Sequence, residues 1–136
     1  MGDVKKYILT DLNKVPDELG TRLYCLHGGM FEGAPYLDCA WFSPQPGERR
    51  VVTESHAHDY PEVVTFFGSD PDDPTDLCGE IEFWLDGEPQ ILTKSCIIFV
   101  PKGMSHCPLI IKRAERPVFH FATSMDPEYQ GPHQKR

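Results

Sequence analysis

The sequence feature that most constrains the fold is a series of short β-prone runs that follow one another through most of the chain. The runs are rich in Val, Ile, Phe and Trp and read YLDCAWF, RRVVTESHAH, EVVTFFG, GEIEFWL, QILTKS, CIIFVP, PLIIKR and PVFHFATS. Gly, Pro and Asp separate them. Short strands at regular spacing are typical of an all-β sandwich or barrel. Long amphipathic helical patterns do not alternate with them, which argues against a parallel α/β sheet.

The length of 136 residues favours a single domain with a proper hydrophobic core. We expect an antiparallel barrel over residues 36–124, preceded by an N-terminal extension over 1–35 and followed by a tail over 125–136. Within the extension, the pattern suggests a strand at 5–10 and a short helix near 15–19. The Asp86-Gly87 pair predicts a hairpin turn.

The run GEIEFWL, residues 79–85, shows the two-residue alternation of a strand with one buried face. An exposed aromatic patch on a small barrel tends to become buried in a partner. The sequence therefore predicts a homodimer through the outer face of one sheet, with exchange of an N-terminal strand as an additional contact. The alternation predicts inward side chains at Ile81, Phe83 and Leu85 and outward side chains at Glu80, Glu82 and Trp84.

Composition excludes several classes of partner. The net charge of −8 and pI near 5.1 argue against a nucleic-acid or anionic-membrane surface, because both need clustered Lys and Arg. The N-terminus lacks the apolar segment of a signal peptide, and apolar runs such as 96–100 are too short to cross a bilayer. Five scattered cysteines without a CxxC motif indicate reduced thiols. We therefore expect a cytoplasmic protein without nucleic-acid or membrane partners.

Two histidines and a glutamate lie within the seven residues His56–Glu62, where an apolar strand is about to begin. Buried imidazoles and carboxylates cost free energy unless they are paired. His56 and His58 are alternate residues, so on a strand they face the same side, roughly 6.5 to 7 Å apart at the backbone. A bend at the intervening DYP would bring the Glu62 carboxylate to that face.

A third histidine, His106, follows the predicted turn PKGMS, residues 101–105. Three imidazole nitrogens and one carboxylate oxygen form a ligand set that suits one divalent transition metal, namely Fe, Mn, Ni, Co or Zn. A single histidine is most often an ordinary core or surface residue. Together, the HxHxxxE pattern and the later PxGxxH pattern favour a metal site.

These two patterns resemble the two sequence motifs of the cupin superfamily. The resemblance spans residues 36–124 and is carried by HAHDYPE and PKGMSH, which contain His56, His58, Glu62, Pro101, Gly103 and His106. It implies a small jelly-roll-like β-barrel. It also implies that the metal inside the barrel is held by His56, His58, Glu62 and His106.

The sequence departs from the motifs at Arg50, Ser95 and Ile110, where the family usually has glycine, glycine and asparagine. Those positions serve turns and packing, so the metal prediction is retained. The acidic segment 69–78 looks like an insertion relative to the minimal cupin. It is predicted to be a solvated surface loop, and because it follows the strand that begins at Glu62 we also consider it as a lid at the mouth of the pocket.

The resemblance implies a metal-dependent enzyme that acts on a small oxygen-rich metabolite by dioxygenase, isomerase, decarboxylase or lyase chemistry. The alternative is a non-catalytic, metal-containing cupin that binds a small molecule or a sugar. An open metal position with a polar acid or base within reach would favour the enzyme.

Three further residues are candidates for general acid or base. Tyr36 and Asp38 share one face of their predicted strand, and Asp38 either faces solvent or meets the substrate. His120, flanked by aromatic residues in VFHFA, points either outward to solvent or inward as a pocket acid or base. We favour the outward orientation.

Overall fold

The structure is a computed structural model in which residues 4–10, 14–16, 22–44 and 46–124 are described. A short 3₁₀ helix, η1, spans Val4–Tyr7. No helix in these ranges is long and apolar enough to cross a membrane. The strands are β1 Lys14–Pro16, β2 Arg22–Leu26, β3 Tyr36–Phe42, β4 Arg49–Val52, β5 Glu62–Gly68, β6 Asp76–Leu85, β7 Glu88–Lys94, β8 Cys96–Val100, β9 His106–Ala114 and β10 Val118–Ser124.

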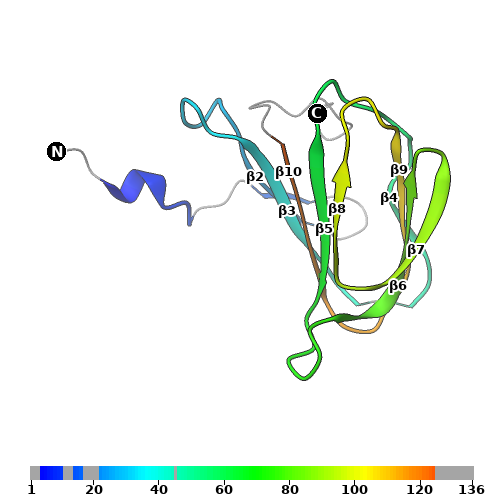
Figure 1. The fold of residues 1–136 in the computed structure, drawn as a ribbon. Helices are drawn as coiled ribbons and strands as arrows, with labels where there is room; N and C mark the ends of the chain where they lie inside the picture. Colours follow the sequence, from blue (N-terminus) through cyan, green and yellow to red (C-terminus); the bar gives the residue numbers. More distant parts are fainter. Residues whose placement is uncertain (1–3, 11–13, 17–21, 45, 125–136) are drawn as a thin grey trace.

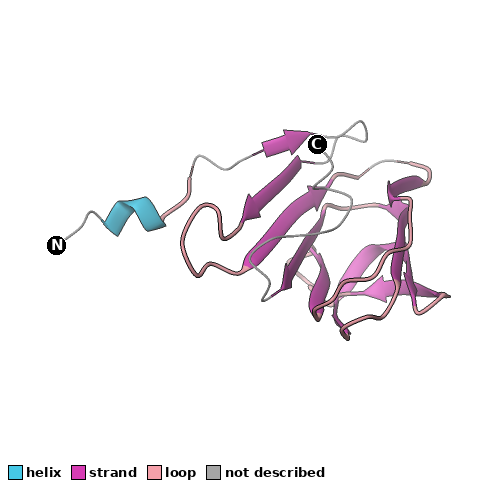
Figure 2. Ribbon diagram, turned by 90° about the horizontal axis from the view of Figure 1, so that it is seen from above, coloured by secondary structure: helices cyan, strands magenta, loops and turns pink. Residues whose placement is uncertain are grey.

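The strands form two antiparallel sheets that face each other across one core (Figure 1). One sheet has six strands in the order β1-β2-β3-β10-β5-β8, and the other has four in the order β4-β9-β6-β7. Figure 2, seen from above, shows η1 lying apart from the two sheets. The all-β, antiparallel two-sheet fold predicted from the sequence is confirmed.

Aromatic and branched aliphatic side chains from both sheets fill the core. Phe66 on β5 and Phe83 on β6 meet between the sheets with ring centroids 6.0 Å apart. Both are essentially inaccessible to solvent, as are Phe42 and Ile111. Burial of such side chains, each contributing about 1.5–3 kcal/mol relative to exposure, is the main stabilising interaction between the sheets.

The N-terminal extension differs from the sequence prediction. The expected strand at 5–10 is wrong, because residues 4–7 form η1. The expected helix near 15–19 is also wrong where it can be checked: residues 14–16 form β1, and residues 17–19 lie outside the described residues. β1 pairs with β2, and β2 pairs with β3. The extension therefore enlarges the six-stranded sheet.

The predicted alternation on β6 is confirmed for Ile81 and Phe83, which are buried, while Leu85 is half-buried. Trp84 is not the exposed aromatic residue that the sequence suggested. It is half-buried, and its indole Nε1–H donates a 2.8 Å hydrogen bond to the Glu82 carboxylate. Exposed large apolar side chains on the strands lie mainly on the six-stranded sheet, at Trp41, Ile97 and Phe99, with Ile91 on β7.

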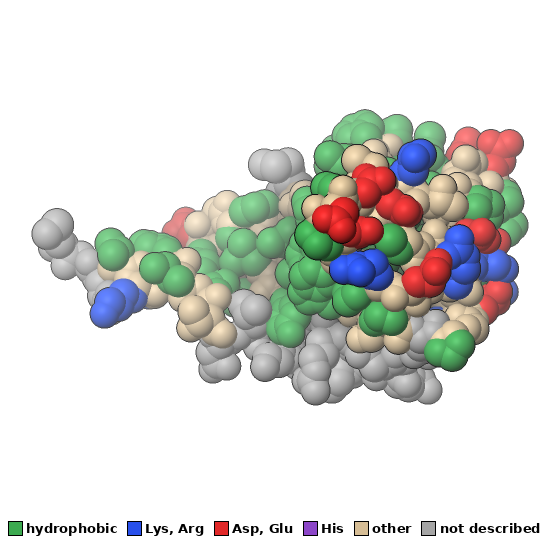
Figure 3. Space-filling model, turned by 90° about the horizontal axis from the view of Figure 1, so that it is seen from below, with side chains coloured by type: hydrophobic (Ala, Val, Ile, Leu, Met, Phe, Trp, Pro, Cys, Tyr) green, Lys and Arg blue, Asp and Glu red, His purple; other side chains and the backbone are tan. Residues whose placement is uncertain are grey.

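The acidic segment 69–78 leaves β5 at the end opposite Glu62, which corrects the expectation that it lies next to the pocket as a lid. β5 begins at Glu62, paired with Val100, and ends at Gly68. Seven strand residues separate the two ends by roughly 20 Å. Figure 3 views this lower end of the barrel, where acidic side chains gather and no histidine of the described chain is visible.

The acidic loop is tightly anchored. Asp70 and Asp73 each accept a hydrogen bond from a backbone N–H two residues later, the pattern of Asx turns. The Ser95 hydroxyl donates to the Pro74 carbonyl and accepts from the Gly68 N–H, at 2.6 and 2.8 Å. A Cβ atom at Gly68 would lie 1.9 Å from the carbonyl oxygen of Asp76.

This close approach generates a stability prediction for Gly68→Ala. Because the added methyl group meets backbone rather than a flexible side chain, we expect the free energy of unfolding to fall by about 1–3 kcal/mol or more. The matched control is Gly87→Asn in the β6–β7 turn, where φ is +78° and the space around a Cβ is open. Asn tolerates that conformation, so the control should cost less than about 1 kcal/mol. Equal urea denaturation midpoints for the two variants would contradict the proposed steric conflict.

Candidate metal centre

His56 and His58 lie in a loop rather than on a strand, which corrects the sequence prediction. β4 ends at Val52, and the segment up to β5 is irregular apart from a single β-bridge at His56. The bridge pairs His56 with His106, the first residue of β9, through backbone hydrogen bonds of 3.0 and 2.9 Å. Two predicted ligands are thus joined directly through their backbones.

The loop is fixed at His58 as well. Its carbonyl accepts a 2.9 Å hydrogen bond from the Gly103 N–H, in the turn that leads to His106. The His58 ring stacks on Tyr60, with centroids 4.9 Å apart and an interplanar angle of 3°. Gly103 has φ +82°, a conformation that glycine adopts without strain. The loop and the turn therefore hold His58 and His106 together.

The structure brings all four predicted ligand residues close to one another. One ring nitrogen from each of His56, His58 and His106 lies within 4.8 Å of the others. The Glu62 Oε1 atom lies 3.0 Å from His106 Nε2 and 3.9 Å from His58 Nε2. His58, Glu62 and His106 are buried, and His56 is half-buried.

The backbone around the cluster selects one histidine tautomer. Nδ1 of His56 lies 3.3 Å from the Glu54 carbonyl, and Nδ1 of His106 lies 3.2 Å from the Met104 carbonyl. Because a carbonyl can only accept, Nδ1 is the donor in each contact, and in the neutral ring this leaves the lone pair on Nε2. Metal-binding histidines commonly show this arrangement, with the other ring nitrogen donating to a carbonyl.

Burial and electrostatics favour the neutral form of the His56 imidazole. Burial lowers the pKa of His56 below its usual value, and the nearby His106 lowers it further. Nε2 of His106 is buried and makes no hydrogen bond of good geometry within the described part of the chain, although Glu62 lies beside it. A buried nitrogen lone pair of this kind is costly without a partner. The cluster of His56, His58 and His106 could hold a metal, which would supply that partner.

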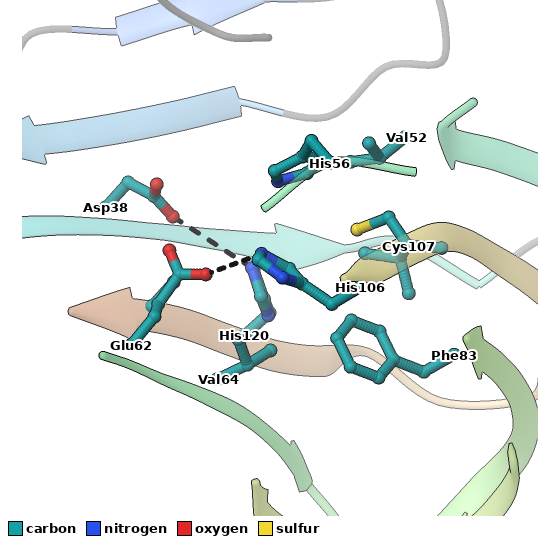
Figure 4. A pocket seen from close by; sticks show the side chains of 11 residues that line it. Asp38, Val52, His56, Glu62, Val64, Phe83, His106, Cys107 and His120 are labelled. Carbon is teal, nitrogen blue, oxygen red and sulfur yellow. Dashed lines mark ion pairs between the residues drawn. The ribbon is translucent and has the colours of Figure 1, made fainter. Parts of the chain in front are cut away.

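His56 and His106 of the cluster, together with Glu62, line a small cavity between the two sheets that opens to solvent. Figure 4 shows the carboxylates of Asp38 and Glu62 next to each other, each directed toward a histidine ring, Asp38 toward His120 and Glu62 toward His106. The remaining lining is apolar: Val52, Val64, Phe83, Leu109 and Ala122, with Cys107.

Asp38 is buried and lines the cavity, so of the two orientations considered from the sequence the inward one is observed. Tyr36, on the same face of β3, is fully buried and donates a 2.8 Å hydrogen bond to Asp38 Oδ2. Burial, followed by the charge of Asp38, raises the pKa of Tyr36 far above its usual value. The phenol therefore remains protonated and acts as a donor.

His120 points inward, and the outward orientation favoured from the sequence is wrong. Its ring stacks against Phe42 and Phe66, with centroids 5.4 and 5.0 Å away. Nδ1 donates a 2.9 Å hydrogen bond to the Thr65 carbonyl, and Nε2 lies 4.0 Å from Asp38 Oδ1. The two stacking rings and the hydrogen bond fix the orientation of His120 toward the cavity.

Cys107 is a lining residue to which sequence reasoning assigned no role. Burial, and then the charge of Glu62, raises the pKa of its thiol to about 12. A thiol with this pKa stays protonated near neutral pH, so Cys107 contributes apolar surface rather than a thiolate. Its position next to His106 in the sequence was the only available signal.

Comparison of the whole chain with known proteins identifies the fold. No family model matches the sequence, and no curated protein matches it. The RmlC-like cupin from Shewanella frigidimarina NCIMB 400 matches with TM-score 0.53 and 18% identity, over 90% of each chain. KdgF from a Halomonas species matches with TM-score 0.54 and 16% identity, over 90% of this chain and 93% of its own.

A larger protein contains a similar unit. The oxalate decarboxylase from Lactobacillus farciminis, in its formate complex, matches with TM-score 0.58 and 15% identity. The match covers 88% of this chain and 32% of the decarboxylase. At these identities the similarity concerns the fold alone. The two facing antiparallel sheets, the histidine cluster between them and these structural matches lead to one conclusion: the chain has a cupin fold.

Proposed function

We propose that the protein is a metal-dependent enzyme acting on a small oxygen-rich metabolite. The ligands of its single divalent transition metal are His56, His58, Glu62 and His106. The observation that carries the proposal is the convergence of three histidine ring nitrogens within 4.8 Å, with a Glu62 oxygen beside them, next to a cavity that His56, Glu62 and His106 line. This donor set suits Fe, Mn, Ni, Co or Zn.

When bound, such a metal supplies a Lewis acid for a substrate oxygen or, if it is iron, a centre for O₂ chemistry. The protein residues supply the rest. Backbone carbonyls orient the His56 and His106 rings, and the apolar side chains around the cavity restrict water. Asp38 and His120 line the same cavity. They therefore border the space that a bound substrate would occupy and can exchange protons with it.

The competing function is a non-catalytic cupin that binds a small molecule or sugar through its metal. The enzyme is favoured because Asp38 and His120 line the same cavity as His56 and His106 and are held in place, Asp38 by Tyr36 and His120 by the Thr65 carbonyl. Two oriented titratable groups beside a cavity are more than binding alone requires. Among the similar structures, the Bacillus subtilis oxalate decarboxylase contains Mn(II) centres and matches with TM-score 0.57 and 17% identity. It supports metal binding on this fold but not a choice of substrate.

The first test is replacement of His58 by alanine. Loss of one ligand should weaken metal binding by at least about tenfold to a hundredfold, judged from the smaller effects of residues that only support ligands. Elemental analysis after loading and gel filtration should find about one metal ion in each wild-type chain and little in the variant. Added metal should raise the thermal midpoint of the wild type but not of the variant.

The matched control is His27→Ala. His27 lies outside the cluster, and its Nδ1 accepts a 3.1 Å hydrogen bond from the Gly29 N–H. This control should keep full metal content. Far-ultraviolet circular dichroism should show that both variants retain their β-structure. Full wild-type metal content in His58→Ala would refute the assignment of His58 as a ligand, and a metal-free wild type after loading would refute the proposed function.

A further inference from the structure

The six-stranded sheet brings polar groups besides Glu62 to the cavity. Asp38, on β3, is only 3% exposed yet lines the cavity, and His120 on β10 lies beside it. These two strands are adjacent, and Ala122, two residues beyond His120, is the partner of Asp38 in the sheet. Figure 4 shows the Asp38 and His120 side chains directed toward the same space as Glu62 and His106.

Hydrogen bonding determines how Asp38 presents itself to a ligand. Tyr36 donates to Asp38 Oδ2, so the carboxylate acts as an acceptor at this atom. The other oxygen, Oδ1, is the one nearest to His120 Nε2, at 4.0 Å. This distance is too long for a direct hydrogen bond and is bridged readily by a hydroxyl oxygen. Because Nδ1 of His120 donates to Thr65, Nε2 of the neutral ring is an acceptor as well.

The charge of the cavity lining is strongly one-sided. Among the described lining residues, Asp38 and Glu62 are carboxylates and none is Lys or Arg. With a divalent metal at the histidine cluster, Glu62 is a ligand and Asp38 remains as a second carboxylate on the same face of the six-stranded sheet. A carboxylate ligand would therefore approach Asp38 without any cationic side chain to compensate the repulsion.

We propose that Asp38 sets the charge selectivity of the cavity: it accepts a hydrogen bond from a hydroxyl group of a small uncharged ligand and disfavours carboxylates. This inference rests on the proposed metal site and narrows its oxygen-rich ligands to uncharged hydroxyl compounds, such as vicinal diols. Tyr36 is a positioning residue, because its hydrogen bond orients the Asp38 carboxylate, and His120 Nε2 borders the space in front of Oδ1.

The test compares two probes of nearly equal size, 1,2-propanediol and lactate. Lactate carries a carboxylate where 1,2-propanediol carries a CH₂OH group. The protein is loaded with Mn(II), and the paramagnetic effect of the metal on the NMR relaxation of the probe protons is measured. Free Mn(II) prefers carboxylate oxygen to an alcohol. The proposal requires the opposite order in the wild-type protein, with 1,2-propanediol bound at least as tightly as lactate.

Replacement of Asp38 by asparagine removes the charge and nearly preserves the shape. The variant should bind lactate more tightly, with a dissociation constant about tenfold lower or more, because a nearby like charge has been removed from a partly buried site. Binding of 1,2-propanediol should weaken or stay the same. The matched control is Asp72→Asn on the exposed acidic loop at the other end of the barrel, which should leave both affinities unchanged.

The outcomes separate this inference from the proposed function. Lactate bound more tightly than the diol by metal-loaded wild type would overturn the charge selectivity and leave the metal site intact. An Asp38→Asn variant that folds and shows unchanged lactate affinity would do the same. A wild type that retains no Mn(II) would overturn the metal site and this inference together. The comparison of the two probes on the wild type does not depend on how well the variant folds.

A second surface stands out independently of the cavity, on the outer face of the six-stranded sheet. Six large apolar side chains on four adjacent strands make up this outer apolar face. Trp41 and Phe119 pack with ring centroids 4.8 Å apart, and Phe67 and Phe121 with centroids 6.1 Å apart. Its members are Trp41, Phe67, Ile97, Phe99, Phe119 and Phe121, of which Trp41, Ile97 and Phe99 are 49%, 69% and 61% exposed.

We infer that a second copy of this chain covers the outer apolar face, giving a two-fold symmetric dimer. None of the outward positions on β3, β5, β8 and β10 carries a charged side chain. Each chain has a net charge of −8, so two copies repel each other. Contact through an uncharged face keeps the acidic side chains of the two copies apart and so reduces this repulsion. A self-complementary apolar face meets that condition, whereas a basic partner would be attracted to the acidic surface elsewhere.

Light scattering on the wild type should give the mass of a dimer. Phe99→Glu should give a monomer, because two-fold symmetry places both new charges in the apolar interface. Ile91→Glu is the matched control, since Ile91 is 53% exposed on β7 of the other sheet, and this variant should remain a dimer. A monomeric wild type, or a Phe99→Glu variant that is still dimeric, would overturn this inference.

Discussion

The two-residue alternation of the antiparallel strands is the constraint on which the rest of this structure depends. It sends one side of the six-stranded sheet into the barrel, and that side carries both core and cavity residues. Ser124 of β10 pairs with Tyr36 on one neighbour and with Glu62 on the other, while the adjacent inward pair joins Ala122 to Asp38. The sheet register therefore fixes the Tyr36–Asp38 pair and Glu62 relative to each other before any side chain contact forms.

Placing polar groups on this inward face has a cost in stability that specific contacts must offset. Asp38 and Glu62 are both nearly inaccessible to solvent. Tyr36 donates to Asp38, and His106 lies beside Glu62. Replacing these groups with apolar residues of similar volume would often be neutral or stabilising in a barrel of this kind. Their presence is easier to explain by what the cavity binds than by what holds the sheets together.

The sequence was sufficient for the fold and for identifying His56, His58, Glu62 and His106 as residues that come together, because short alternating runs and the spacing of these four residues are local patterns. It was insufficient for the location of the acidic loop, since that depends on which way β5 runs. The expectation that His56 and His58 lie on a strand was wrong, because β4 ends at Val52. A single backbone bridge between His56 and His106 of β9 holds the loop beside the sheet instead.

The orientation of His120 could not be decided from VFHFA for a related reason. Alternation identifies the inward residues only when the outward ones are polar, and here Phe119 and Phe121 on the outer face are as apolar as the core. The outer apolar face was not recognised from the sequence either, because Trp84 looked like the exposed aromatic residue while Trp41 is the one that is exposed.

The separation of the two ends of the barrel has a consequence for protein engineering. The histidine cluster lies where β5 begins, and the acidic loop lies where β5 ends. The loop base is held by Ser95 and by the close contact at Gly68, whereas Asp72 near the tip is exposed. A peptide tag or a fluorescent label attached at the tip would therefore be carried far from the cavity. The loop offers a place to immobilise the protein on a surface with the end of the barrel that carries the histidine cluster facing the solution.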